Sequence, residues 1–231
     1  MENNMNNEFE EVRTEITKTP EKPVFDWKKE TGEWVVAIIA AVVIAFVIRT
    51  FFFTLVQVSG PSMEETLHTG DRLIVTRINY TPKAGDIVVF RPDQHPREPY
   101  IKRVIATEGQ KVDINFVKGI VYVDGKELEE DYIKNLTQRQ GDVEFPITVP
   151  EGCVFVMGDN RMESHDGRSL DVSSIKTENV TDSDVRYSFV DENTGEVKEE
   201  AVYYGCVDRA DIIGKARFRL WPLDKFGSLY K

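Results

Sequence analysis

Residues 100–107 read YIKRVIAT and residues 86–90 read DIVVF, two short apolar runs rich in β-branched residues. Asp124-Gly125, between VYV and KEL, is a dipeptide that favours a tight hairpin turn. Similar runs follow one another without a helical stretch between them: RLIVTRI (72–78), VKGIVYVDGKEL (117–128), CVFVMG (153–158) and IIGKARFRLW (212–221). The sequence therefore predicts a mainly β fold, an antiparallel sheet that is barrel-like or sandwich-like.

The composition suits one domain of catalytic size with an appended piece. The chain has 231 residues, of which 41% are hydrophobic and 30% charged. Its 29 Lys and Arg against 40 Asp and Glu give a formal net charge of −11. A surface that binds nucleic acid needs positive charge to meet the phosphates, so no nucleic-acid partner is expected.

The two cysteines, Cys153 and Cys206, are too few for a disulfide scaffold and lack the spacing of zinc ligands. A bridge between them and a pair of small buried hydrophobic side chains both remain open. The sequence contains no HExxH motif and no clustered ligand set, so neither a metal nor another cofactor is expected.

An uncharged run near the amino terminus, WVVAIIAAVVIAFVI (34–48), continues after Arg49 as TFFFTLVQV. Fifteen helical residues fall short of a hydrocarbon layer about 30 Å thick, whereas about 25 cross it with some tilt. Arg49 lies near one end and reaches the headgroups with its long side chain. The run predicts one transmembrane α-helix over residues 34–56. A buried core helix is disfavoured because the run has no polar face, and a cleaved signal peptide because a long polar segment precedes it.

The basic residues predict the orientation of this helix. Four lysines lie within 20 residues before it, whereas the first basic residue after Arg49 is Arg72. Because cytoplasmic flanks carry an excess of Lys and Arg, we expect a single-pass type II protein of the cell membrane with residues 57–231 outside. Residues 1–33 are interpreted as a disordered cytoplasmic tail.

The net negative charge arises from two segments. Residues 1–33 hold 5 basic and 9 acidic residues, and residues 171–211 hold 4 basic and 11 acidic residues, which leaves 20 of each sign elsewhere. Residues 171–211 are interpreted as an acidic insertion in the β domain, with Asn193-Thr194-Gly195 as a hairpin turn between RYSFV and AVYYG. The net charge thus comes from the tail and the insertion, and the rest of the chain is electroneutral.

Ser62 follows Gly60-Pro61 in the stretch SGPSMEETL, directly after the apolar run. Glycine and proline favour a tight, fixed turn, which presents a hydroxyl and leaves backbone N–H groups free to face a developing oxyanion. Because an ordinary loop serine gives the same local pattern, this motif gains weight only in combination with others.

Lys102 lies in the strand YIKRVIA, where period-two alternation places it on one face with Tyr100, Val104 and Ala106. Desolvation of a buried lysine favours its neutral amine, which is the form that acts as a general base toward a serine. A lysine that reaches solvent from an edge strand is the alternative.

The loop MGDNRMESHDGR, residues 157–168, follows the apolar strand CVFV. We expect oppositely charged residues two positions apart to lock this loop, and its serine to hydrogen-bond the lysine amine and orient it. The loop gathers Asp159, Asn160, Arg161, Ser164, Asp166 and Arg168.

In combination, these motifs resemble the bacterial type I signal peptidases of Gram-positive type, which are membrane-anchored serine proteases with a Ser/Lys dyad. The resemblance is carried, in the family's order, by SGPSM, GDIVVF, YIKRVIA, GDNRMESHDGR and GKARFRLWP, and it leaves out the tail and residues 171–211. It implies that Ser62 is the nucleophile and Lys102 the general base.

The resemblance also assigns supporting roles to the polar loop. Ser164 would position the lysine. Asp166 and Arg168 would form a structural ion pair, and Asp159 and Arg161 would shape the loop.

The chain departs from the family's pattern around the nucleophile and beyond it. Glu65 stands where the family usually has proline, and Gly60 where the Gram-negative branch has a serine that supplies an oxyanion donor. Ala106-Thr107 replaces a more usual glycine, and Gly167 stands where a serine is common. We therefore expect the oxyanion hole to use the Ser62 N–H with another amide and no side chain.

Three other functions fit parts of the sequence. A Ser-His-Asp triad would use His165 beside Asp166, but adjacent residues usually diverge in direction. A self-cleaving Ser/Lys regulator would be soluble and carry a DNA-binding module. A non-catalytic binding domain would not need both Ser62 and Lys102, which are intact.

The resemblance thus implies a serine endopeptidase, signal peptidase I, that removes amino-terminal signal peptides from exported preproteins. It implies a preference for small residues one and three positions before the cut. The expected partners are preproteins and the lipid bilayer, and the protein is expected to be a monomer.

Overall fold

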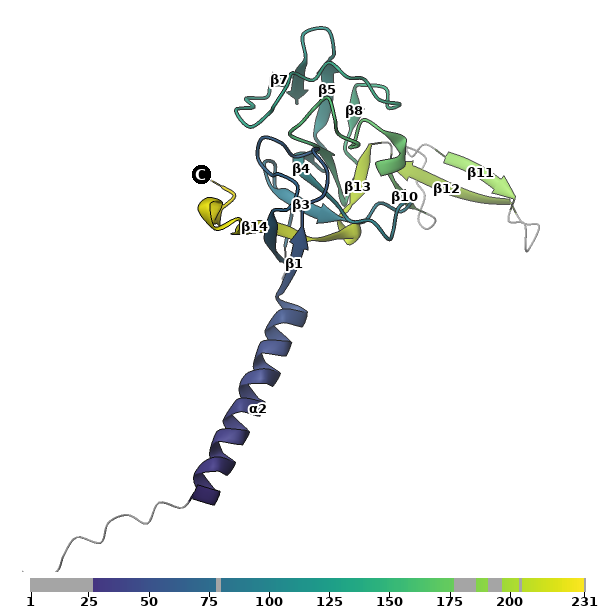
Figure 1. The fold of residues 1–231 in the computed structure, drawn as a ribbon. Helices are drawn as coiled ribbons and strands as arrows, with labels where there is room; N and C mark the ends of the chain where they lie inside the picture. The colour runs from purple at the N-terminus through teal and green to yellow at the C-terminus, as the bar shows by residue number, and fades with distance from the viewer. Residues whose placement is uncertain (1–26, 78–79, 177–185, 191–196, 204, 231) are drawn as a thin grey trace, which may run out of the picture. The chain divides into compact units, whose positions relative to one another are not determined.

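The computed structural model describes residues 27–77, 80–176, 186–190, 197–203 and 205–230 (Figure 1). The chain forms two compact units, and the boundary between them falls after Phe46.

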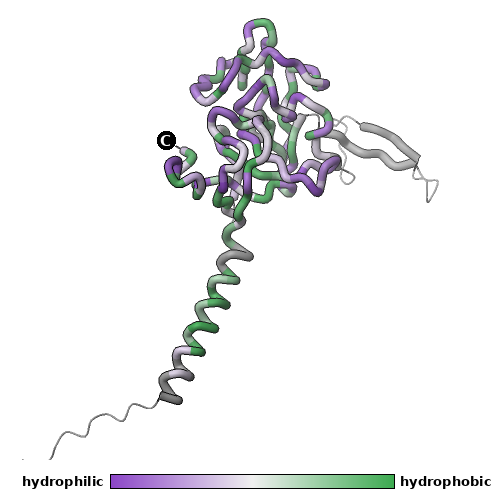
Figure 2. Tube along the Cα trace, viewed as in Figure 1, coloured by the Kyte–Doolittle hydropathy of each residue, from purple (hydrophilic) through white to green (hydrophobic). Residues whose placement is uncertain are grey.

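The helix α2 spans Trp27–Phe51. Its described large apolar side chains, from Trp34 to Val47, are 41% to 69% exposed, and Figure 2 shows the hydrophobic colouring along this stretch. Among the described residues, no helix is both long enough and apolar enough to cross a membrane.

The bounds of α2 differ from those expected for a helix over 34–56. The helix begins within the segment interpreted as a disordered tail, whose residues 1–26 lie outside the described part of the chain. It ends before residue 56 because Phe53–Gln57 form strand β1, which pairs with Arg72–Thr76. The alternation of exposed and half-buried residues in β1 is that of a strand with one covered face.

The second unit is built on one large sheet with the strand order β1-β2-β14-β3-β4-β9-β13, and β15 pairs with β14. The pairing within this sheet is antiparallel throughout. Besides β1, its strands are β2 (Arg72–Thr76), β3 (Ile87–Phe90), β4 (Tyr100–Thr107), β9 (Cys153–Met157), β13 (Cys206–Asp208), β14 (Ile212–Trp221) and β15 (Gly227–Ser228). The prediction of a mainly β, antiparallel fold is confirmed.

Two smaller sheets accompany it. One has the order β7-β6-β5-β8, and its hairpin turn is formed by Asp124 and Gly125, which both have positive φ as a two-residue turn of this kind requires. Its strands are β5 (Lys111–Asn115), β6 (Ile120–Val123), β7 (Lys126–Glu127) and β8 (Ile147–Thr148).

The other small sheet has the order β10-β12-β11 and lies within the acidic segment 171–211. Its strands are β10 (Ser174–Lys176), β11 (Arg186–Val190) and β12 (Val197–Tyr203). The antiparallel pairing of β11 with β12 fits the expected hairpin, although the turn at Asn193-Thr194-Gly195 lies outside the described residues. Short 3₁₀ turns are η1 (Leu170–Val172), η2 (Arg209–Asp211) and η3 (Leu223–Lys225).

The core follows the strands that are buried on both faces. β3 and β9 are buried along their whole length, and β4 is buried apart from its two end residues. Cys153 and Cys206 lie in this core as buried thiols. A rigid, dry platform therefore underlies the loops that follow β1 and β9.

Candidate active site

Lys102 lies in β4 beside a gap in the strand pairing. β4 pairs with β3 from Tyr100, but with β9 only from Arg103 onward. Only 4% of Lys102 is exposed. The alternative of a lysine that reaches solvent from an edge strand is therefore excluded.

Ser62 lies in a turn that the core holds in place. Met63 and Leu67, which follow it, are buried in the cluster formed by β1, β2, β3 and β14. Gly60 has a φ of +89°, a conformation that favours glycine, and its N–H donates to Thr69 Oγ1. The turn after β1 thus has a fixed geometry.

The two residues meet although 40 positions separate them. Lys102 Nζ lies 3.0 Å from Ser62 Oγ and 3.0 Å from the carbonyl oxygen of Ile101. A serine hydroxyl and an amine at this distance exchange a proton directly. The nucleophile and base expected from the sequence are therefore within hydrogen-bond distance of each other.

Burial shifts the acid–base equilibrium of the lysine. Desolvation lowers the pKa of Lys102 from 10.5 to about 8, and the Arg168 guanidinium acts in the same direction. The carboxylates of Asp166 and Asp159 oppose the shift. A substantial fraction of Lys102 is then neutral near pH 8, as a general base requires.

Asp166 and Arg168 form the expected ion pair. Both Asp166 oxygens accept hydrogen bonds from the Arg168 side chain, each 2.8 Å long, and the Gly158 N–H donates a third at 2.9 Å. Burial raises the pKa of Asp166, but these partners outweigh it and lower the pKa below its usual value. The pair fixes both ends of the loop between Gly158 and Arg168.

Ser164 is buried in the same loop beside the nucleophile. Its Oγ lies near Asp166 and helps to lower the pKa of that carboxyl, but among the described residues it makes no hydrogen bond of normal geometry. The expected bond to the Lys102 amine is therefore not formed in this structure. A Cβ added at Gly158 would overlap both Ser164 Oγ and the Ser62 carbonyl oxygen. Glycine at 158 therefore lets the serine loop approach the nucleophile closely.

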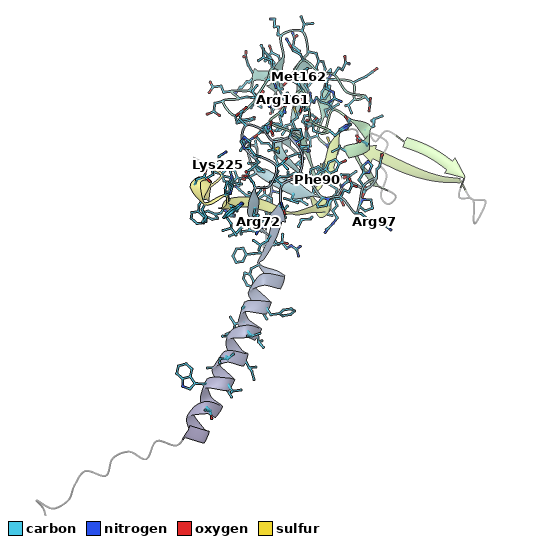
Figure 3. The ribbon with its side chains drawn as sticks, viewed as in Figure 1. Arg72, Phe90, Arg97, Arg161, Met162 and Lys225 are labelled. Atoms are coloured by element: carbon cyan, nitrogen blue, oxygen red, sulfur yellow. The ribbon has the colours of Figure 1, made fainter. Side chains whose placement is uncertain are left out.

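Asp159 and Arg161 do not pair with each other, contrary to the expectation for residues two positions apart. Asp159 accepts from Nε and Nη2 of Arg103, at 2.8 and 2.7 Å. Arg161, labelled in Figure 3, is fully buried and bonds to Glu130 and Thr137. The two side chains reach different parts of the domain because successive residues of an irregular loop do not share a face.

Sequence reasoning missed Arg103 and Glu130, and it named Asn160 in the polar loop without assigning it a role. The sequence does contain a signal for Arg103. It follows Lys102 directly in the same apolar strand and so faces the opposite side, where a buried charge needs a partner of opposite charge. Asn160 holds the nucleophile turn through its backbone N–H and side-chain amide. Glu130 lies in a polar loop that gives no local sign of contact with Arg161.

A histidine triad is not assembled. His165 Nδ1 lies 3.7 Å from Asp171 Oδ2, and the carboxylate of Asp166, its neighbour in sequence, is taken by Arg168. The base within reach of Ser62 is Lys102.

A cleft of about 610 Å³ opens at the dyad. Ser62 and Lys102 line it, and much of its apolar wall comes from β1, β3 and β4 through Val56, Val89 and Ile101. The site therefore combines a serine hydroxyl, a buried lysine amine and a cleft with both apolar and polar walls.

Comparisons with known proteins identify the family of this chain. The family model for signal peptidase, peptidase S26, matches residues 31–221. The chain is 30% identical over 217 residues to signal peptidase IB of Staphylococcus aureus, covering 86% of this chain and 94% of that protein. It is 33% identical over 202 residues to probable signal peptidase I-1 of Synechocystis sp., covering 83% of each. A solved signal peptidase I from Enterococcus faecalis V583 is 24% identical, with a TM-score of 0.35, over 59% of this chain and 97% of that chain. The family model and the two curated relatives show that the chain belongs to the bacterial type I signal peptidases, the serine peptidases of family S26.

Proposed function

We propose that this protein cleaves signal peptides from exported preproteins with a catalytic dyad of Ser62 and Lys102, as a monomer anchored in the cell membrane. The observation that carries the proposal is the 3.0 Å contact between Lys102 Nζ and Ser62 Oγ, at a lysine whose burial lowers its pKa to about 8.

Acylation begins when the neutral amine of Lys102 takes the proton of the Ser62 hydroxyl. Ser62 Oγ then attacks the scissile carbonyl carbon, and the oxygen of the tetrahedral intermediate carries the negative charge. The Ser62 N–H stabilises that oxyanion. When the C–N bond breaks, the Lys102 ammonium gives its proton to the leaving amine of the mature protein.

Deacylation repeats the same transfers with water. Lys102, neutral again, takes a proton from a water molecule, and the resulting hydroxide attacks the acyl-enzyme. Ser62 Oγ leaves and recovers a proton from Lys102. No cofactor takes part in either half of this cycle.

The loop between Gly158 and Arg168 supports the dyad. Asp166 and Arg168 close the loop, and Asp159 bonds to Arg103, the neighbour of the base in β4. In this proposal the buried hydroxyl of Ser164 receives a hydrogen bond from the Lys102 amine when Ser62 is acylated and no longer partners it.

The cleft supports a preference for small side chains before the cut. Part of its wall is apolar and close to the dyad, with Val56, Val89 and Ile101 among the lining residues. Small residues one and three positions before the scissile bond would pack there, because alternate side chains of an extended peptide face the same side.

Membrane anchoring rests on the apolar run in α2. Its described apolar side chains are exposed, and exposed surface of this kind needs a partner that removes it from water. By its Lys and Arg distribution, the helix would leave the amino terminus in the cytoplasm and the sheet domain outside. Only ten residues separate Phe51 from Ser62, which would keep the nucleophile near the outer membrane face where cleavage sites emerge.

The test is cleavage of a preprotein in detergent by the wild type and by Ser62→Ala and Lys102→Met. We expect both variants to lose cleavage by at least about 1,000-fold, because neither half of the dyad replaces the other. Ser169→Ala and Lys111→Met serve as matched controls, since Ser169 makes no side-chain cap bond and Lys111 is exposed, and both should cleave normally. Substantial cleavage by either dyad variant would refute the mechanism.

A further inference from the structure

Asn160 makes contact with both peptide groups that flank the nucleophile. Its backbone N–H donates to the Ser62 carbonyl oxygen at 3.0 Å, and its side-chain Nδ2 donates to the Pro61 carbonyl oxygen at 3.2 Å. Asn160 is 1% exposed, so both bonds are sheltered from water. One residue thus holds two consecutive carbonyl groups.

The Pro61 oxygen also accepts a hydrogen bond from the Glu64 N–H at 3.1 Å, and together with this bond the two Asn160 bonds restrict the backbone conformation of Ser62. A peptide group is planar, so a bond to the Pro61 oxygen fixes the plane before the Ser62 Cα, and a bond to the Ser62 oxygen fixes the plane after it. The angle between these planes is set by φ and ψ of Ser62. The directions of its N–H and of its Cα–Cβ bond are therefore fixed together.

The direction of the N–H follows from the same plane. The Pro61–Ser62 peptide is trans, so its C=O and N–H point in opposite directions. With the carbonyl drawn toward Asn160, the Ser62 N–H is aimed away from the 158–168 loop. It has no hydrogen-bond acceptor among the described residues, whereas the neighbouring Gly60 N–H is already bonded to Thr69.

Asn160 is itself held in one orientation. Its Oδ1 accepts from Asn135 Nδ2 at 3.3 Å, which directs its Nδ2 toward Pro61. At Gly158, the absence of a side chain lets the loop reach the Ser62 carbonyl. The amide is thus preorganised, as effective oxyanion stabilisation requires.

We propose that Asn160 is a positioning residue that aims the Ser62 N–H at the oxyanion of the tetrahedral intermediate. The inference rests on the proposed function of Ser62. It assigns Asn160 a role distinct from that of the dyad, because its effect falls on transition-state stabilisation and leaves proton transfer unchanged.

The decisive variant is Asn160→Ala, which removes the side-chain bond to Pro61 and keeps both the Glu64 N–H bond to Pro61 and the backbone bond to Ser62. Loss of one oxyanion donor costs about 100- to 1,000-fold in kcat, and a misdirected donor costs part of that. We expect kcat to fall about 10- to 100-fold and KM to change less than about threefold. Asn160→Asp, which keeps the shape but replaces the donor with an acceptor, should be at least as impaired.

Two further readouts separate positioning from a merely structural role. A peptide aldehyde forms a tetrahedral adduct with the nucleophile, and we expect its inhibition constant to rise in parallel with the fall in kcat. The inhibition constant of the matching peptide carboxylate, a product analogue, should stay unchanged. Because the ratio of the two constants is independent of how much enzyme is folded, it remains informative if a variant is unstable.

The fall of kcat/KM at acidic pH reports the protonation of Lys102. The pH at which it falls should be the same in Asn160→Ala and Asn160→Asp as in the wild type. Thr137→Val is the control for loss of a buried hydrogen bond in the same region, and we expect it to lower the melting temperature without changing the ratio of inhibition constants. The proposal is overturned if Asn160→Ala keeps kcat within about threefold of wild type, if both inhibitors weaken equally, or if the fall of kcat/KM shifts to another pH. An inactive wild type would instead refute the proposed function.

Discussion

Lys102 Nζ and Ser62 Oγ lie 3.0 Å apart at a lysine that burial keeps largely from water. In the proposed mechanism the catalytic form of this amine is neutral, and its pKa is lowered from 10.5 to about 8. We therefore expect kcat/KM to rise with pH, to reach half of its plateau near pH 8, and to fall about tenfold for each pH unit below that. The profile is measured with a peptide substrate between about pH 5 and pH 10. A maximum below about pH 6 would contradict the lysine base.

The same shift predicts how the lysine affects stability. Below about pH 8 both folded and unfolded states bind the proton, and the folded state bears the full cost of burying an ammonium group. Between about 8 and 10.5 the unfolded state holds more protons, so the contribution of this group to stability rises with pH.

At pH 7, Lys102→Met should therefore have a larger free energy of unfolding than the wild type, by up to about 3 kcal/mol, and a higher melting temperature. The difference should shrink as the pH approaches 10. Thermal unfolding of both proteins at several pH values tests this. A constant difference across that range would show that the buried charge is not the cause.

Gly158 predicts a steric effect at the site. A methyl group there would overlap Ser164 Oγ and the Ser62 carbonyl oxygen, so Gly158→Ala should lower kcat at least about 100-fold by displacing the nucleophile turn. Gly85→Ala is the matched control, because Gly85 has a φ of +87° but open space around it. It should cost about 1 kcal/mol of stability and little activity. Equal loss of activity in both variants would argue against the steric explanation.

Arg161 and Glu130 predict a contrast between buried and exposed ion pairs. Arg161 is fully buried and the Glu130 side chain is 5% exposed, so Arg161→Met leaves a buried carboxylate without its partner. We expect a loss of about 3–5 kcal/mol in unfolding free energy, much of which Arg161→Met with Glu130→Met recovers. Lys134→Met breaks the more exposed pair with Glu64 and should change the unfolding free energy little. Denaturant unfolding measures all three variants.

How much of this site the sequence predicts depends on how far apart along the chain the contacting residues lie. Ser62 and Lys102 were predictable because each lies in a motif with its own chemical logic, and the ion pair of Asp166 with Arg168 because it is local. The partners of Asp159 and Arg161 come from β4 and from the polar loop before β8, so local spacing carried no information about them. Similarly, the predicted end of α2 was wrong because the apolar character of Phe53–Val56 suits a helix as well as a strand. The pairing of these residues with β2 makes them a strand.

The histidines provide a last test of the dyad. His165 lies near Asp171, and the carboxylate of Asp166 is occupied by Arg168, so no histidine is arranged as a base for Ser62. His95 also faces Asp171, with its side chain 42% exposed. We expect simultaneous replacement of His68, His95 and His165 by Gln to leave kcat/KM within about threefold of wild type, in the same preprotein assay. Complete loss of cleavage in the folded triple variant would mean that a histidine transfers the proton. Retention of both activity and the rise in rate near pH 8 leaves Lys102 as the group whose deprotonation the profile reports.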